Sequence, residues 1–254
     1  LSSSIHMGHS EVMKLLLDAK ADVNQPQASN GRTPMHTACE KGRVDMIKML
    51  LAKGADAEQI VTNGDDQGWS PLSLAATFGH AEAVEALIER GVDVNQTTGG
   101  PNGQSPLYLA CCKGHVTVLR LLLAAKADAD AVTTRFVDNV RRCTALYITV
   151  LEGTEKHLTC ARLLLENGAT VDKLGDMEGG GSGQRPINAD YGTPLFCACT
   201  GPHEVDLQVW ASERRCDLAI PPPVCACDLT SLLSLSLCSQ GRTLETPCSP
   251  GGRP

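Results

Sequence analysis

Histidine and cysteine are the residue types in this 254-residue chain that would suit catalysis or metal binding, since 7 histidines and 12 cysteines are present. A catalytic histidine is needed once, beside specific partners. Histidine here instead recurs at one point, directly before leucine-rich stretches such as "HVTVLRLLL" at 115–123. The recurrence predicts a structural role, in which the ring binds backbone at a turn. These residues, called the turn histidines below, are His9, His80, His115, His157 and His203, with Arg43 in one further copy.

Cysteines near the C-terminal end raise the alternative of a zinc site. Zinc fingers commonly space a cysteine pair as C-x2-C, whereas one residue separates Cys197 from Cys199. Both cysteines also align with positions that are apolar or small in other copies, including Leu109 and Cys111. We therefore predict small core thiols, and neither a metal nor another cofactor. The zinc alternative would use Cys197, Cys199, His203, Cys216, Cys225 and Cys227.

The elements that position these residues are internal repeats. Residues 31–58, 68–95 and 103–130 align without a gap, and 142–172 fit after three inserted residues, Thr154 to Lys156. In each copy Thr or Ser precedes the first helical stretch, as at Thr33 and Ser70, which suits a helix N-cap. A glycine nine residues later suits a left-handed helix end. Apolar residues then recur at i, i+3 and i+4, which predicts a second helix. One helix pair cannot bury that stripe alone, so the copies are expected to stack.

The first helix has its most complete motif in "TPMHTA" at 33–38, and parts of the motif return as "SPLSLA", "SPLYLA", "TALYIT" and "TPLFCA". Each second helix is followed by an end such as "KADVN", "GADAE" or "GVDVN". These segments resemble ankyrin repeats. The resemblance implies an all-α ankyrin-repeat solenoid of helix-turn-helix units with long hairpin loops, in about five and a half repeats. The sequence departs from the pattern at Ala145, where proline is expected.

The resemblance covers residues 1–219, which are assigned to an ankyrin-repeat domain. Spacing varies mainly in the fingers, the connections that follow each second helix. Residues 220–254 are a low-complexity tail rich in Pro, Ser, Leu and Cys, and are predicted to be disordered. Alternatively, the tail is a gene-model artefact such as a frameshift. The repeat units are 1–29, 30–66, 67–101, 102–141, 142–190 and 191–219, the first truncated and the last degenerate.

Composition and motifs argue against several classes of function. A net charge of −7 disfavours an extended phosphate-binding surface. No apolar run approaches the roughly 18 residues of a membrane span, and no G-x-S-x-G, Walker-type or dinucleotide-binding glycine motif occurs. We therefore expect a non-enzymatic cytoplasmic protein, or a nuclear one, without nucleic acid, membrane insertion or a small-molecule substrate.

The resemblance further implies that a partner protein binds the concave face, formed by the fingers and the first helices. Side chains that vary between units are the expected contacts. Trp69 is the strongest candidate, because tryptophan is enriched at binding hot spots. The alternatives are that Trp69 packs on the neighbouring finger and that the tyrosines fill the space between units. The predicted partner-binding residues are Arg32, Trp69, Gln104, Glu40, Lys41, Phe78, Tyr108 and Lys113.

The sequence thus predicts a protein–protein interaction scaffold or adaptor. An alternative is the ankyrin region of a larger multidomain protein, such as a kinase, a ubiquitin-ligase adaptor or a channel, whose activity lies outside these residues. The incomplete units at both ends and the missing initiator methionine favour that alternative.

Overall fold

The computed structural model describes residues 1–64, 66–99, 103–133, 136–137, 140–141 and 143–171. All of them lie in the first of two units of the chain, Leu1–Trp210, and none lies in the second, Ala211–Pro254. The predicted sixth repeat, the predicted tail and the cysteines of the zinc alternative therefore lie outside the described residues.

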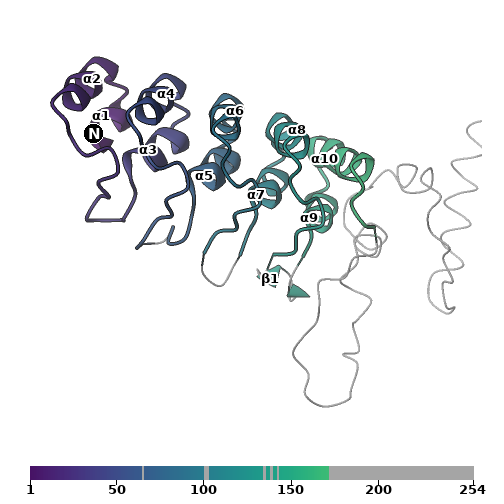
Figure 1. Cartoon of the computed structure of the whole chain (residues 1–254). Helices are drawn as coiled ribbons and strands as arrows, with labels where there is room; N and C mark the ends of the chain where they lie inside the picture. Colours follow the sequence, from purple (N-terminus) through teal and green to yellow (C-terminus); the bar gives the residue numbers. More distant parts are fainter. Residues whose placement is uncertain (65, 100–102, 134–135, 138–139, 142, 172–254) are drawn as a thin grey trace, which may run out of the picture. The chain divides into compact units, whose positions relative to one another are not determined.

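The helices follow one another in pairs, a first and a second helix in each unit. The first helices form one row, the second helices form another row beside it, and the fingers leave on the side of the first helices (Figure 1). The predicted helical solenoid is confirmed, and the truncated first unit retains both of its helices. The pairs are α1 (Ser2–Met7) with α2 (Ser10–Asp18), α3 (Pro34–Glu40) with α4 (Val44–Ala52), α5 (Pro71–Phe78) with α6 (Ala81–Glu89), α7 (Pro106–Cys112) with α8 (Val116–Ala124), and α9 (Ala145–Glu152) with α10 (Glu155–Glu166).

One finger contains a short antiparallel ladder that the all-α prediction omitted. Strand β1 (Phe136–Val137) pairs with β2 (Val140–Arg141), and Phe136 lies opposite Arg141. A bridge between Val132 and Thr144 closes the base of the same finger. Thr144 consequently enters α9 with an extended backbone, the conformation that a helix N-cap residue adopts.

Hydroxyl side chains cap α3, α5, α7 and α9, as the sequence predicts. The Ser70 hydroxyl accepts a hydrogen bond from the backbone N–H of Ser73 at 3.2 Å. Such a bond satisfies one of the donors that the first helical turn leaves unpaired. Helix α9 lacks the usual proline but keeps the equivalent bond from its Thr144 cap. The three inserted residues lengthen the start of α10, which has 12 residues against 9 in α8.

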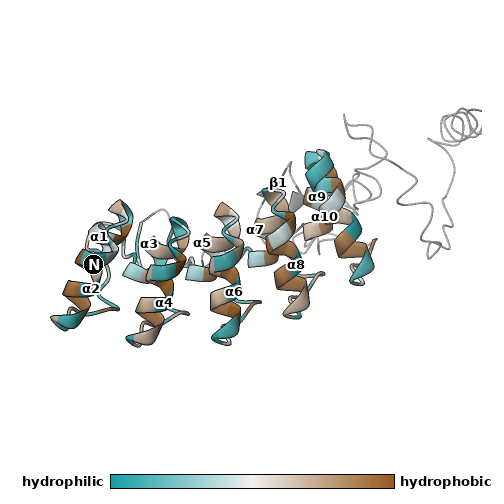
Figure 2. Cartoon of the chain, turned by 90° about the horizontal axis from the view of Figure 1, so that it is seen from above, coloured by the Kyte–Doolittle hydropathy of each residue, from teal (hydrophilic) through white to brown (hydrophobic). Residues whose placement is uncertain are grey.

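The apolar stripes of the second helices form the core between units, and each of these helices carries both hydrophobic and hydrophilic residues (Figure 2). Leu50, Leu87 and Leu122 occupy one position in successive units and are fully buried, at 0% exposure. The equivalent Leu16 of the first unit is 36% exposed, and the adjacent Leu15 is 70% exposed. Because no described unit precedes this first helix pair, the comparison indicates that the preceding unit supplies the burial at this position.

Truncation of these equivalent leucines is expected to have unequal effects. Leu122→Ala leaves a cavity between two units and is expected to lower the free energy of unfolding by about 2–5 kcal/mol. Leu16→Ala removes the same atoms from a partly exposed site and is expected to cost less than half as much. Urea unfolding of both variants, followed by circular dichroism, measures the difference. Equal losses would contradict the proposed source of the burial.

Candidate functional site

The turn histidines connect neighbouring units. His80 Nε2 lies 2.8 Å from the carbonyl oxygen of Glu40, and His115 Nε2 lies 3.0 Å from that of Thr77. A carbonyl oxygen only accepts hydrogen bonds, so each Nε2 is the donor. His157 makes the same contact with Cys112, at 3.3 Å. For these three histidines the predicted structural role is confirmed, but the acceptor lies in the preceding unit rather than in the histidine's own turn. His203 lies outside the described residues.

Glycine is required where these rings cross the boundary between units. Gly42 has a φ of +62°, and a β-carbon there would lie 2.5 Å from His80 Nδ1. Gly79 has a φ of +77°, and a β-carbon there would lie 2.6 Å from His115. Left-handed backbone already favours glycine. The approach of the next ring adds a second reason, which the sequence alone did not reveal.

The fingers have a ladder of their own, which the sequence interpretation missed. The Asn24 side-chain oxygen accepts a hydrogen bond from the Asp56 N–H at 2.9 Å, one unit further along. Asn95 repeats this contact with the Asp128 N–H at 2.8 Å. The only sequence signal was the recurrence of a polar residue two positions after an aspartate. These contacts hold successive fingers in register on the exposed side of the stack.

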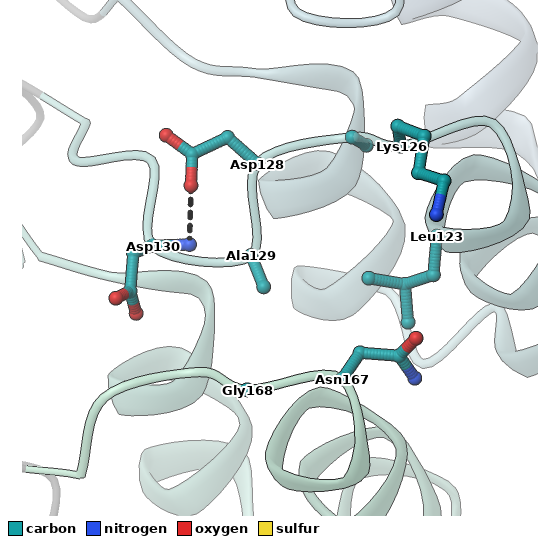
Figure 3. A pocket seen from close by; sticks show the side chains of 8 residues that line it. Leu123, Lys126, Asp128, Ala129, Asp130, Asn167 and Gly168 are labelled. Carbon is teal, nitrogen blue, oxygen red and sulfur yellow. Dashed lines mark hydrogen bonds between the residues drawn. The ribbon is translucent and has the colours of Figure 1, made fainter.

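The last step of this ladder lines a pocket of about 310 Å³ between the ends of α8 and α10 (Figure 3). The Asp130 N–H donates to Asp128 Oδ1 at 2.9 Å. The Asp130 carboxylate in turn accepts a hydrogen bond from the Thr170 N–H at 2.7 Å. Both aspartate side chains therefore accept hydrogen bonds from backbone N–H groups of the fingers. Within the described residues, no three His, Cys, Asp or Glu side chains gather as a metal site.

The cysteines at the unit boundaries are core thiols. Cys39 and Cys111 align with each other on α3 and α7 and are fully buried. Burial raises the pKa of both thiols well above the usual range. A buried neutral thiol is a poor nucleophile and a poor metal ligand. For these described positions the prediction of small apolar residues is confirmed.

Charged side chains gather where α3 meets the following finger. Arg32 forms ion pairs with Glu40 and Asp66, and Lys41 Nζ lies 3.0 Å from Glu40 Oε1. Burial alone would raise the pKa of Glu40, but the hydrogen bond from Lys41 and the charges of Arg32 and Lys41 outweigh it and lower the pKa. Arg32 Nε is buried without a hydrogen-bond partner. The cluster therefore joins three of the predicted contact residues, with Arg32 and Glu40 mostly engaged in ion pairs.

His36 and Trp69 link the first helix of one unit to the finger base of the next. His36 Nδ1 accepts from the Thr33 N–H at 3.1 Å, while Nε2 donates to the Trp69 carbonyl at 3.1 Å. A neutral ring satisfies both bonds. Burial is the main reason that the pKa of His36 is lowered to about 4, and the nearby Arg32 charge acts in the same direction. The Trp69 backbone is thus fixed, and its side chain is half-buried.

The other predicted contact residues differ in exposure. Phe78 is 49% exposed, and its ring stacks on His80 with a centroid distance of 6.4 Å. Lys113 is exposed. Tyr108 is 0% exposed, with its hydroxyl 3.8 Å from Cys143 Sγ, and thus fills the space between units as the alternative interpretation expects. Gln104 is 5% exposed, and its side-chain amide nitrogen has no hydrogen-bond partner.

Residues 1–98 and 96–175 match a family profile described as ankyrin repeats (3 copies). The chain belongs to the ankyrin-repeat family. Domains of this family are generally non-catalytic binding modules. No helix in the described part of this ankyrin-repeat chain is long and apolar enough to cross a membrane.

Three relatives illustrate the proteins in which similar repeats occur. The protein fem-1 homolog A-like of Mus musculus is 34% identical over 39% of this chain and 14% of its own length. The transient receptor potential cation channel subfamily A member 1 of Drosophila melanogaster is 29% identical over 37% of this chain and 8% of its own length. The putative palmitoyltransferase ZDHHC13 of Danio rerio is 30% identical over 66% of this chain and 29% of its own length. The ankyrin-repeat chain thus spans less than a third of each of these relatives.

Acid is expected to destabilise the chain through His36. The unfolded residue has its usual pKa of 6.5 and the folded one a pKa of about 4, so the unfolded state binds more protons between these values. Stability is therefore fully present above pH 6.5 and falls as the pH drops toward 4, by about 3 kcal/mol in total. His36→Gln keeps a polar side chain that does not titrate, and should reduce this fall. Urea unfolding from pH 7 to pH 4 compares the two chains, and parallel curves would contradict the assignment.

Proposed function

We propose that the chain is a protein–protein interaction scaffold or adaptor that binds a partner protein through the first helices and finger loops of its ankyrin stack. The observation that carries the proposal is the contrast between recurring and varying positions. The glycine that follows each first helix recurs, and so does the turn histidine, which only Arg43 replaces among the described units. The residue just before that glycine is Lys41, Phe78, Lys113 or Glu152 in successive units.

Exposure supports the same surface. Phe78 is 49% exposed at the end of α5, and the half-buried Trp69 precedes the start of the same helix. Large aromatic side chains contribute much binding energy when a partner desolvates them. Tyr108 and Gln104 are buried, so we leave them out of the proposed contact surface. Within this proposal the chain has no catalytic activity of its own and binds neither nucleic acid nor a small-molecule substrate.

A second candidate is that the chain is the ankyrin region of a larger protein, whose activity lies in other domains. The lengths of the relatives favour it, because the chain spans 14% of the fem-1 homolog, 8% of the cation channel and 29% of the palmitoyltransferase. A full-length transcript tests this candidate. A contiguous catalytic or membrane domain would support it, and a reading frame restricted to the repeats would contradict it.

Capture of a partner tests the interaction proposal. The full 254-residue chain serves as bait, and Trp69→Ala and Phe78→Ala are compared with Leu15→Ala, which truncates another exposed apolar residue, 70% exposed on α2. The first two variants are expected to reduce capture about tenfold or more, the loss expected when a hot-spot residue is truncated. Leu15→Ala should leave capture unchanged, and all three should melt close to the unmodified chain. If Trp69→Ala and Phe78→Ala lower the melting temperature and leave capture intact, the proposed contacts are wrong.

A further inference from the structure

Three residues at the C-terminal ends of adjoining first helices form a row at least partly exposed to solvent, which we call the Lys–Phe–Lys row: Lys41, Phe78 and Lys113. Each directly precedes a left-handed glycine, at Gly42, Gly79 and Gly114, with φ of +62°, +77° and +67°. Phe78 is 49% exposed, and Lys113 is exposed. The Lys41 side chain is 34% exposed. The equivalent positions of the stack therefore present cation, aromatic ring and cation in order.

Inter-unit contacts hold the aromatic ring of this row in place. The Phe78 ring stacks on His80 with an interplanar angle of 18°. His80 lies against Gly42 and donates to the Glu40 carbonyl, so the histidine of the stacked pair contacts the backbone on both sides of Lys41. On the other side, His115 lies against Gly79 and donates to the Thr77 carbonyl, directly before Phe78. A ring fixed in this way loses little conformational freedom when a partner binds.

The charges along the row favour an acidic ligand. Lys41 shares Glu40 with Arg32, and Arg32 is also paired with Asp66, so a ligand carboxylate at Lys41 would replace part of its contact with Glu40. No ion pair is recorded for Lys113 within the described residues. The net charge of −7 is spread over the whole chain, and salt screens it beyond about 8 Å, so the nearby lysines dominate. Glu152 occupies the next equivalent position and would repel a carboxylate, which limits the row to three units.

The spacing of the row sets the spacing of its ligand. Packed helices lie about 8–10 Å apart, so each lysine is about one such step from Phe78. A peptide in the extended polyproline II conformation advances about 3.1 Å per residue and returns a side chain to the same face every three residues, so one step corresponds to three residues. We propose that the Lys–Phe–Lys row binds an extended acidic segment of a partner protein, with an apolar side chain on Phe78 and a carboxylate three residues away on each side. This inference rests on the proposed interaction function and specifies the chemistry of its partner.

A labelled peptide tests the row directly. Fluorescein-labelled Gly-Glu-Ser-Thr-Leu-Ser-Thr-Glu-Gly has the proposed spacing, and its fluorescence anisotropy is measured against the full chain. We expect saturable binding that weakens about tenfold or more in Phe78→Ala and in Lys113→Glu, and that weakens when salt is raised. The matched control is Lys48→Glu, which makes the same charge reversal at an exposed lysine on α4 and should change binding less than twofold. A peptide with both glutamates replaced by glutamine should also bind about tenfold more weakly.

A selection from random nine-residue peptides covers the case in which the chosen sequence is not the best one. The peptides are selected for binding to the full chain and counter-selected on Phe78→Ala. Enrichment of acidic residues three positions either side of an apolar residue supports the inference. Absence of that pattern overturns it, and so does an effect of Lys48→Glu equal to that of Lys113→Glu. Partner capture that depends on Trp69 and Phe78, without any acidic enrichment, would overturn this inference and leave the proposed function standing. Thermal melting of every variant shows that each remains folded.

Discussion

The close contact that His80, His115 and His157 make with the unit before each of them is the constraint on which the rest of the stack depends. His80 and His115 each donate to the last carbonyls of the preceding first helix, and each ring lies where a β-carbon of Gly42 or Gly79 would otherwise be. Buried leucines supply most of the favourable free energy, but apolar contact is not directional. The hydrogen bond and the steric fit therefore fix how one unit sits on the next. Arg43 repeats the steric part of this contact, since its guanidinium lies 3.1 Å from the position of a β-carbon at Gly8.

Much of the fold could be predicted from the sequence, because the repeats reveal which positions recur. Caps, helix-ending glycines and apolar stripes are local patterns, and the structure bears them out. The acceptor of each turn histidine could not be predicted, because alignment shows that a residue recurs and not which unit it touches. Burial could not be read from the pattern either: Leu16 and Leu122 align, yet among the described residues only Leu122 has a unit packed before it. For the same reason Tyr108, which varies like a surface residue, is fully enclosed.

The recurring glycine and histidine positions directly follow the residues of the Lys–Phe–Lys row in the chain. The row can therefore vary while the glycine and histidine positions recur. Glycine and histidine fix the backbone at the end of each first helix, so the preceding side chain is free to change without disturbing the stack. Phe78 connects the row with the recurring positions, since its half-exposed ring stacks on His80. The same His80 donates a hydrogen bond to the preceding unit. A partner that binds the row would therefore contact side chains already held in position by the inter-unit bonds.

The most direct measurement of the central claim is a double-mutant cycle between Gly79 and His115, by equilibrium unfolding. Gly91→Ala is the reference, because Gly91 has a φ of +80° and no atom within 4 Å of a β-carbon, so it reports backbone strain alone. The account predicts that Gly79→Ala destabilises the chain more than Gly91→Ala does, and that the excess disappears in a His115→Ala background. The expected coupling is about 0.5–3 kcal/mol, as for residues in direct contact. An excess that persists without the histidine ring would contradict the claim.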